Sequence, residues 1–354
     1  MGYTKTEFGR MADGTDVYRY TLTNDHGVSA SFTDLGGIWL TMMVPDREGR
    51  MADVILGYDS VNSILTEPGH LGEPVGRNAN RIGGAKFTLN GVTYELQANS
   101  AGVNNLHSGP DYYRDRRWNT KVEESELGTR ITFQLHSPDG DQGYPGSADI
   151  EISYTLTPDD SLRLDYHMVS DADTIANFTN HVYFNLGGHD SGCAVKQRVW
   201  IDADAFTIAD ETSIPTGELV PVKGTPMDFT EMKEIGRDID ADYEPLKMAG
   251  GFDHNWVLNH AKGELALCAK AEDRASGRTL EVYTDLPGIQ FYTANGLRTD
   301  KGKGGVNYHR RDGYCFETQY FPDAINKPQF ESPVLKAGET YHTTTVYKFG
   351  VEHF

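Results

Sequence analysis

The sequence predicts an all-β protein, built as a large antiparallel β-sandwich with few short helices. Alternating apolar and polar runs recur along most of the chain, and clusters of glycine, proline, aspartate and asparagine separate them. Short strands at regular spacing with such turns are typical of antiparallel sheets. Helical periodicity is scarce, so short helices are expected only at 59–67 and 229–236.

The most strongly specified element is a hairpin at 86–96, KFTLNGVTYEL. Asn90-Gly91 is a favoured pair for a two-residue type I′ turn. The cross-strand pairs that this turn predicts are Leu89 with Val92, Thr88 with Thr93, Phe87 with Tyr94, and Lys86 with Glu95. One face of the hairpin is then apolar, and the other carries two hydroxyls and one pair of opposite charges.

Further strands are expected at 130–137, 148–157, 161–170, 279–286, 289–295 and 340–349. The apolar strand at 340–349 implies that the end of the chain completes a sheet. No repeat of fixed period and no linker rich in proline or serine divides the sequence. We therefore expect one domain over residues 1–354.

The charge balance of 32 basic against 52 acidic residues gives a net charge of −20. This disfavours nucleic acid and anionic membranes as partners, since both recruit basic surfaces. Three widely spaced cysteines suit a reducing compartment. Residues 1–14 lack the apolar core of a signal peptide, and no apolar run approaches the roughly 18 residues of a membrane span. These features favour a cytoplasmic protein and leave monomer and homodimer open.

The stretch NFTNHVYFNLGG at 177–188 alternates like a strand, yet one of its faces is wholly polar. That face holds Asn177, Thr179, His181, Tyr183 and Asn185. The opposite face is apolar apart from Asn180 and needs a core to pack against. The polar face is either solvated or the wall of a polar pocket, and His181 is the candidate functional group on it.

Two loops carry further candidates. GRNANRIGG places Asn80 and Arg81 between glycines, where a guanidinium offers donors to hydroxyls or carboxylates. The alternative is a turn in which Arg81 is only salt-bridged. NNLHSGP places His107 just before a turn signal, where a histidine is usually just exposed.

Three strand residues complete the set of candidates. Asp253, in GGFDHNWVL, enters an apolar strand unless it only caps a turn. Gln290, in PGIQFYTAN, can hydrogen-bond a ligand or merely a neighbouring loop. Glu317, in GYCFETQYFPDA, lies in an aromatic-rich strand, where burial would raise its pKa. A carboxylate there is either a satisfied structural group or a functional one.

Common metal, nucleotide and hydrolase motifs do not match. DIDADYE at 238–244 begins like a calcium loop, but Tyr243 and Ala249 stand where an EF-hand needs Gly and Glu. KGKGG at 301–305 lacks the Lys-Ser/Thr pair of a phosphate loop, and no HExxH, paired CxxC or GxSxG motif occurs. We therefore expect no metal.

Taken in order, these stretches resemble the aldose 1-epimerase family, also called galactose mutarotases. The similarity extends from LGGIWLTMMVPDREGRMADVILGYD at 35–59 to ETQYFPDAINKPQFESPVLKAGETYHTTTVYKF at 317–349, so it covers nearly the whole chain. The resemblance implies a galactose mutarotase-like β-supersandwich with an open sugar cleft. It also implies an enzyme that interconverts the α- and β-anomers of free aldohexoses, such as galactose and glucose, without a cofactor.

Matched residue by residue, the resemblance makes Glu317 the catalytic base and His181 the catalytic acid. The substrate-binding residues that it implies are Asn80, Arg81, His107, Asp253 and Gln290. The partner is then a small monosaccharide. The chemistry requires an ionised Glu317 and a protonated His181 near neutral pH, which neighbouring carboxylates and hydrogen-bond donors are expected to provide.

The sequence also departs from the family pattern beside the expected cleft. GHLGEPVGR at 69–77 stands where a Phe-Gly-Ala-like run is common, Ser108 stands where a Gly is frequent, and Val182 stands where a small residue is common. These differences leave the preferred sugar open more than the reaction.

Two alternatives also stay open. A hexose-6-phosphate mutarotase would need several cations at one end of the sugar, for which Arg310 and Arg311 are available in a loop. A sugar-binding module without turnover would keep the cleft, although the presence of both Glu317 and His181 argues against it.

Overall fold

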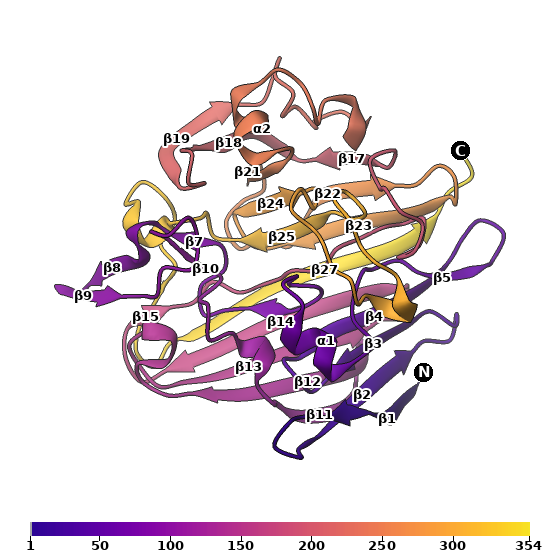
Figure 1. Ribbon diagram of the computed structural model, residues 1–354, viewed down its shortest axis with the longest axis horizontal. Helices are drawn as coiled ribbons and strands as arrows, with labels where there is room; N and C mark the ends of the chain where they lie inside the picture. Colours follow the sequence, from indigo (N-terminus) through magenta and orange to yellow (C-terminus); the bar gives the residue numbers. More distant parts are fainter. Residues whose placement is uncertain (1) are drawn as a thin grey trace.

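The computed structural model describes residues 2–354, and antiparallel strands make up most of it (Figure 1). This confirms the all-β prediction. The two α-helices in the described part of the chain are short: α1 (Val61–Thr66) and α2 (Glu244–Ala249). Neither is long and apolar enough to span a bilayer.

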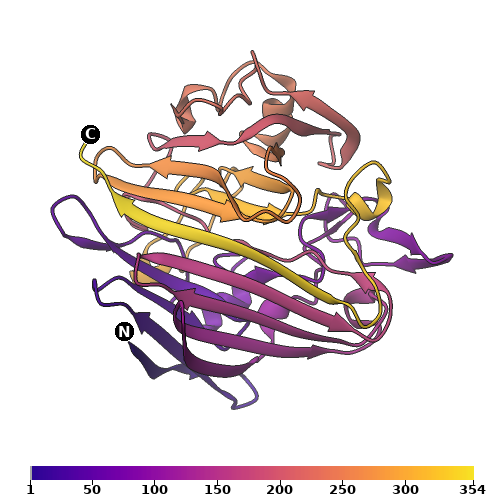
Figure 2. The same ribbon diagram turned by 180° about the vertical axis from the view of Figure 1, so that it is seen from behind.

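The largest sheet contains nine strands, and the C-terminal strand lies inside it. In spatial order the strands are β11 (Asn119–Ser125), β12 (Gly128–Ser137), β13 (Ala148–Leu156), β14 (Ser161–Ser170), β27 (Thr340–Val351), β23 (Arg278–Thr284), β22 (Ala266–Glu272), β17 (Arg198–Ile201) and β20 (Lys233–Glu234). Figure 2 shows the yellow β27 crossing between the magenta and orange strands. β27 therefore joins the two halves of this sheet, as its apolar alternation predicted.

Two five-stranded sheets accompany the large one. The first holds β1 (Gly2–Arg10), β2 (Asp16–Thr23), β3 (Ser29–Thr33), β4 (Ile38–Pro45) and β5 (Met51–Asp53). The second holds β19 (Pro215–Pro221), β18 (Ala203–Ala209), β21 (Asp253–Leu258), β24 (Gly288–Tyr292) and β25 (Cys315–Gln319). The adjacent strands β21, β24 and β25 carry three of the predicted site residues.

One apolar cluster extends across all three sheets. Phe184 lies near its centre, with ring centroids 5.1 Å from Tyr347 on β27 and 6.4 Å from Phe316 on β25. Trp39 on β4 reaches the same Tyr347 ring at 5.7 Å. Because each buried aromatic side chain removes about 150–250 Å² from water, this cluster holds the sheets together and fixes the strand ends that bear the site.

Four smaller sheets of two strands each accompany the three main sheets. They are β6 (Pro74–Val75) with β16 (Thr179–Asn180), β7 (Arg81–Ile82) with β10 (Asn105–Leu106), β8 (Lys86–Leu89) with β9 (Val92–Glu95), and β15 (Thr174–Ile175) with β26 (Val334–Leu335). The first two pairs draw together three loops that the sequence singled out, at 76–84, 104–110 and 177–188.

The hairpin at 86–96 has the predicted register in every pair. Asn90 and Gly91 both adopt positive φ angles, 52° and 79°, as a type I′ turn requires. The hydroxyls of Thr88 and Thr93 lie 2.9 Å apart on its exposed face. Turn chemistry and side-chain alternation specify the same pairing, so this local prediction held without tertiary information.

One local prediction was wrong, and one open alternative is decided. The helix expected at 229–236 is absent, because β20 pairs there with β17 and is followed by a 3₁₀ turn at Ile235–Arg237. The buried Lys233 ammonium anchors this segment by donating to the Pro226 carbonyl at 2.7 Å. At 177–188 only two residues form a strand, and both faces of 177–186 are buried, so the polar face is not solvated.

Candidate active site

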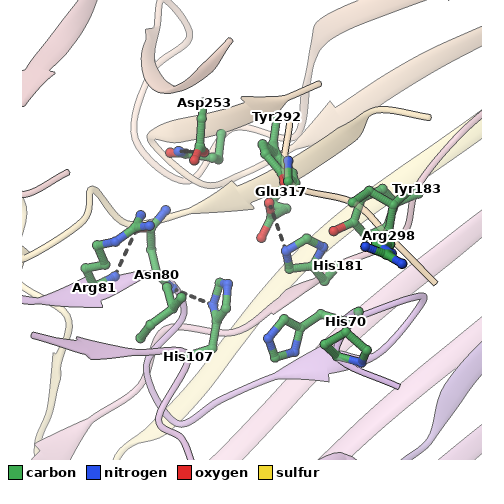
Figure 3. Close-up of a pocket in the computed structure, with 16 residues that line it drawn as sticks. His70, Asn80, Arg81, His107, His181, Tyr183, Asp253, Tyr292, Arg298 and Glu317 are labelled. Atoms are coloured by element: carbon green, nitrogen blue, oxygen red, sulfur yellow. Dashed lines mark hydrogen bonds and ion pairs between the residues drawn. The ribbon is translucent and has the colours of Figure 1, made fainter. Parts of the chain in front are cut away.

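A single pocket collects all seven predicted site residues (Figure 3). The pocket lies where β21, β24 and β25 meet the loops at 76–84, 104–110 and 177–188. Its predicted members are Asn80, Arg81, His107, His181, Asp253, Gln290 and Glu317. Long-range packing has therefore joined residues that are up to 237 positions apart, since 317 − 80 = 237.

Glu317 and His181 face each other across this pocket. Glu317 Oε1 lies 3.7 Å from His181 Nε2, and their side chains are only 3% and 6% exposed. The other imidazole nitrogen, Nδ1, lies 3.5 Å from Cys315 Sγ. No donor among residues 2–354 reaches Glu317 Oε2, which is buried. A buried carboxylate oxygen without a partner is a vacant acceptor for a ligand hydroxyl.

The pKa values of Glu317 and His181 shift in opposite directions. Burial, with a further contribution from Asp253, raises the pKa of Glu317 well above its usual range. Burial and the neighbouring His70 lower the pKa of His181 to about 3. Desolvation outweighs the surrounding donors and carboxylates, so in the unliganded protein both pKa values shift against the expected order of an ionised Glu317 beside a protonated His181.

Asn80 and His107 form a reciprocal contact at the floor of the pocket. Both adopt left-handed backbone angles, with φ of 62° and 54°. The His107 N–H donates to the Asn80 carbonyl at 2.9 Å, and the Asn80 N–H donates to His107 Nδ1 at 3.1 Å. Burial lowers the pKa of His107, so the neutral ring carries its proton on Nε2. The exposed-loop alternative for His107 is excluded, since it is 6% exposed.

Asp253 and Gln290 come from paired strands at another wall. The Gln290 amide donates to Asp253 Oδ1 at 2.7 Å, and Gln290 Oε1 accepts from Gln319 at 3.1 Å. Asp253 is the first residue of β21, and its side chain belongs to this hydrogen-bond network. It therefore does more than cap a turn. Arg81 makes no ion pair within residues 2–354, and its buried Nε has no partner, so the salt-bridged turn alternative is not supported.

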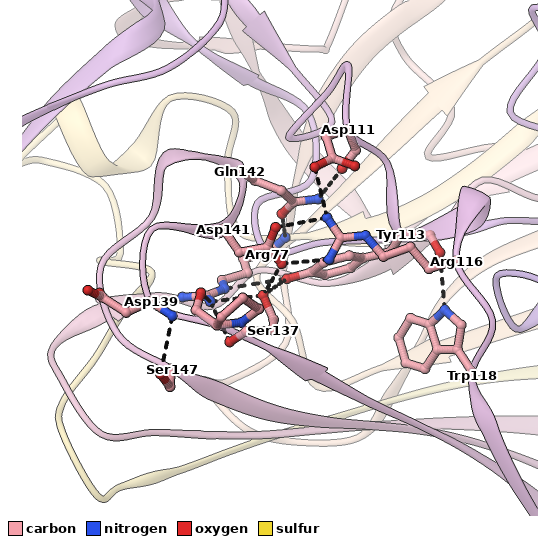
Figure 4. Close-up of polar contacts among 11 residues, drawn as sticks. Arg77, Asp111, Tyr113, Arg116, Trp118, Ser137, Asp139, Asp141, Gln142 and Ser147 are labelled. Atoms are coloured by element: carbon pink, nitrogen blue, oxygen red, sulfur yellow. Dashed lines mark hydrogen bonds and ion pairs between the residues drawn. The ribbon is translucent and has the colours of Figure 1, made fainter.

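Arg77 anchors the loop that carries the Asn–Arg pair (Figure 4). Its side chain is fully buried, and it donates to Ser137 Oγ at 2.9 Å and to the Pro145 carbonyl at 3.0 Å. The preceding Gly76 has no room for a side chain, because a Cβ atom there would lie 2.1 Å from the Phe178 ring. The loop is thus fixed by contacts on the side facing away from the pocket.

Sequence reasoning missed several residues that line the pocket. Those of chemical interest are His70, Tyr183, Tyr292 and Arg298. Tyr183 lies two residues after His181 and stacks on it with ring centroids 5.0 Å apart, so strand alternation placed it correctly without giving it a role. His70 lies in GHLGEPVGR, the stretch that departs from the family pattern. A histidine three residues before a glutamate in that turn was the available signal.

Three of the predicted site residues could also hold a metal ion. His107, His181 and Glu317 each offer one ligand atom, and these atoms lie within 4.8 Å of one another. Two neutral imidazoles and a carboxylate are a donor set that suits divalent transition metals. The same three groups also suit proton transfer and hydrogen bonding to an uncharged ligand.

Comparison with known proteins places the chain in one family. The sequence model for aldose 1-epimerase matches residues 18–348. Galactose mutarotase of Bos taurus is 40% identical over 350 residues, covering 98% of each chain, and aldose 1-epimerase of Escherichia coli (strain K12) is 34% identical over 343 residues, covering 96% of this chain and 97% of the relative. The crystal structure of galactose 1-epimerase from Lactobacillus acidophilus NCFM superposes with a TM-score of 0.87 at 26% identity, covering 99% of each chain. The fold, the pocket and these similarities show that the chain belongs to the aldose 1-epimerase family.

Proposed function

We propose that the protein interconverts the α- and β-anomers of free aldohexoses such as galactose and glucose, and that Glu317 and His181 transfer the protons. The observation that carries this proposal is the buried pair itself, 3.7 Å apart in a pocket that also holds five polar binding candidates. Family membership supports the reaction class, and the geometry supports the assignment of roles.

Anomer exchange needs two proton transfers and no covalent intermediate with the protein. Glu317 takes the proton from the C1 hydroxyl while His181 delivers one to the ring oxygen, and the bond between C1 and the ring oxygen breaks. The resulting aldehyde rotates about the C1–C2 bond. Ring closure reverses both transfers, so each group regains its starting state. One positioned acid or base typically contributes about 10²–10⁴-fold to such a rate.

The active protonation state differs from the resting state by one proton moved between the two side chains. In the unliganded pocket, burial raises the pKa of Glu317 and lowers that of His181, which favours the proton on the carboxyl. A sugar hydroxyl that donates to the vacant Glu317 Oε2 stabilises the carboxylate and lowers its pKa. Sugar binding therefore supplies the charge order that the reaction requires, with Glu317 ionised and His181 protonated.

The remaining polar groups hold the sugar while C1 turns. Arg81 and the Nε2–H of His107 offer donors, and Asp253 offers acceptors to ring hydroxyls. Gln290 orients Asp253 and is itself oriented by Gln319. Such a mutually fixed set restricts a neutral polyol better than separate flexible side chains, because less side-chain entropy is lost on binding.

A sugar 6-phosphate is a weaker candidate substrate. Arg81 and Arg298 are the cationic side chains lining the described pocket, apart from its histidines. The two arginines that the sequence offered lie elsewhere, since Arg311 pairs with Asp240 at 2.6 Å and Arg310 donates to the Gly250 carbonyl at 2.7 Å. The site thus lacks the cluster of cations that a phosphate would attract.

Anomer exchange measured by polarimetry and by NMR magnetisation transfer tests the proposal. The panel contains galactose, glucose, arabinose and xylose, together with galactose 6-phosphate and glucose 6-phosphate. We expect catalysed exchange of the free hexoses and much slower exchange of the phosphates. Faster exchange of the phosphates would instead identify a sugar-phosphate mutarotase. Tight sugar binding with exchange at the uncatalysed rate would show a binding module.

A further inference from the structure

His70 is a pocket residue that the proposed mechanism does not use. It lies in the loop between α1 and β6 and is 17% exposed at its side chain. Its ring stacks on His181, with centroids 5.4 Å apart and 26° between the planes, and meets His107 edge-on at 5.2 Å. In Figure 3 it lies on the side of His181 away from Glu317.

A buried carboxylate fixes the orientation of this ring. His70 Nδ1 lies 2.5 Å from Glu73 Oε1, and Arg114 lies 3.2 Å from the other oxygen of the same carboxylate. Burial by itself would raise the pKa of Glu73, but the nearby His70 and Arg114 hold it below its usual value. An ionised Glu73 accepts from Nδ1–H, which fixes the imidazole in one orientation, as carboxylates do behind functional histidines.

Nε2 is consequently the polar atom that His70 offers to the pocket. No group among residues 2–354 bonds it. The surrounding loop is already tied down without the ring, because Arg114 bonds both the Gly69 carbonyl at 2.8 Å and Glu73. Holding the loop therefore does not require a histidine at this position, and an oriented nitrogen facing a sugar pocket has a use in recognition.

We propose that His70 recognises the C6 hydroxyl of a hexose by a hydrogen bond to Nε2. The inference rests on the proposed function, in which Glu317 serves the C1 hydroxyl and His181 serves the ring oxygen. Along that edge of a pyranose, the group after the ring oxygen is the hydroxymethyl on C5. Glu317, His181 and His70 follow one another along the wall in the same order. A hydroxyl both donates and accepts, so it can bond Nε2 in either protonation state of the ring.

Galactose and its analogues without this hydroxyl isolate the contact. 6-Deoxygalactose lacks only the hydroxyl on C6, and L-arabinose has the ring stereochemistry of galactose without the whole hydroxymethyl group. We expect the unmodified protein to prefer galactose over 6-deoxygalactose in kcat/KM by about 10-fold or more, because the analogue leaves an oriented polar atom unpaired.

Two substitutions test the roles of the two imidazole nitrogens of His70 separately. His70→Asn places an amide where Nδ1 lies, which keeps the bond to Glu73 but removes the pocket nitrogen. His70→Gln places an amide where Nε2 lies. We expect His70→Asn to abolish the preference for galactose over 6-deoxygalactose in kcat/KM, whereas His70→Gln retains part of it. The effect of His70 on the pKa of His181 is common to all three sugars and cancels in this ratio. His136→Asn is the matched control, since His136 is 63% exposed and bonds Asp149 on the surface.

The outcomes are distinguishable from failure of the proposed function. If the unmodified protein exchanges galactose and 6-deoxygalactose equally well, His70 does not recognise the C6 hydroxyl. The same conclusion follows if His70→Asn lowers kcat/KM for all three sugars by one common factor. In either case the exchange of galactose by the unmodified protein, and its loss in Glu317→Gln, still report on the acid–base pair separately.

Discussion

Glu317 shows at the scale of one residue how function costs stability. Its carboxyl is 3% exposed, and Oε2 has no donor among the described residues. Burying such a group is unfavourable unless it stays protonated or finds a partner. Residues that weaken the fold without evident compensation cluster at functional sites, which supports a role for this carboxyl in binding and proton transfer.

Replacing Glu317 by Gln is expected to separate activity from stability. The amide cannot accept the C1 proton, so kcat should fall by about 10²–10⁴-fold. The amide also carries no charge to desolvate. Because the folded-state pKa of Glu317 is raised above the usual 4.5, the wild-type protein loses stability as pH rises from there toward the folded pKa. The gain in Tm of Glu317→Gln should accordingly be absent near pH 4 and grow toward pH 8.

Thermal unfolding followed by circular dichroism at several pH values, together with polarimetry on galactose, measures both effects. Glu126→Gln, at an exposed turn, is the control and should change neither quantity. Near-normal exchange rates in Glu317→Gln would remove this residue from the mechanism.

The pH dependence of kcat/KM should report the shared proton of the pair. Since both groups work with one proton between them, a second proton on His181 stops catalysis as pH falls toward about 3. Loss of the proton from Glu317 stops it as pH rises through the raised pKa of that carboxyl. We expect a broad plateau between these limits, with apparent pKa values that belong to the pair. A narrow bell-shaped profile of kcat/KM with apparent pKa values of about 4.3 and about 6.5 would indicate an unperturbed carboxyl and imidazole. That result would contradict this interpretation.

His181→Asn is the companion variant. It removes the acid while leaving an amide, and kcat should fall by about 10²–10⁴-fold with a smaller change in KM. The pH profile of kcat/KM is measured for this variant as well. If His181→Asn keeps the acidic limb of the wild-type profile, His181 is not the group that causes that limb.

At the scale of elements, the site depends on how its loops are anchored. Arg77 lies behind the loop of Asn80 and Arg81, and the network in Figure 4 satisfies its guanidinium with carbonyls and hydroxyls from distant segments. Arg77→Met should lower the free energy of unfolding by about 3 kcal/mol or more, because it leaves several buried acceptors unpaired. It should also raise KM, since Asn80 and Arg81 lose their positions.

Urea unfolding and polarimetry check this prediction. Arg10→Met is the control, because Arg10 is 63% exposed and pairs with Asp16 at the surface, where ion pairs contribute little. A shift in the unfolding midpoint of Arg77→Met no larger than that of Arg10→Met would be inconsistent with an anchoring role.

Some elements were predictable from their own residues, and others depended on contacts with distant parts of the chain. The hairpin at 86–96 was predictable because its turn type and side-chain alternation are local. The segment 229–236 was mispredicted as helix, because pairing with β17 and burial of Lys233 override a weak local preference. At 177–188 the polar face is buried against loops from elsewhere in the chain, which alternation by itself could not show.

At the scale of the whole molecule, β27 ties both halves of the large sheet to a shared core. It pairs with β14 on one side and β23 on the other, and the apolar cluster extends across the three main sheets. We propose on this basis that the chain forms one domain. Far-UV circular dichroism and tryptophan fluorescence should then give coincident urea transitions, since Trp39 on β4, Trp200 on β17 and Trp256 on β21 lie in three different sheets. Two separate transitions would divide the chain into independent units.

The sequence by itself determined the class of fold, most strand positions and the identity of the seven candidate site residues, because alternation, turn chemistry and ordered motifs are carried by neighbouring residues. It could not determine that burial raises the pKa of Glu317 and lowers that of His181, or that His70 and Glu73 join the site. Those properties depend on desolvation and on contacts between segments far apart in the chain. Only the tertiary structure sets how much water each group loses and which charge lies beside it.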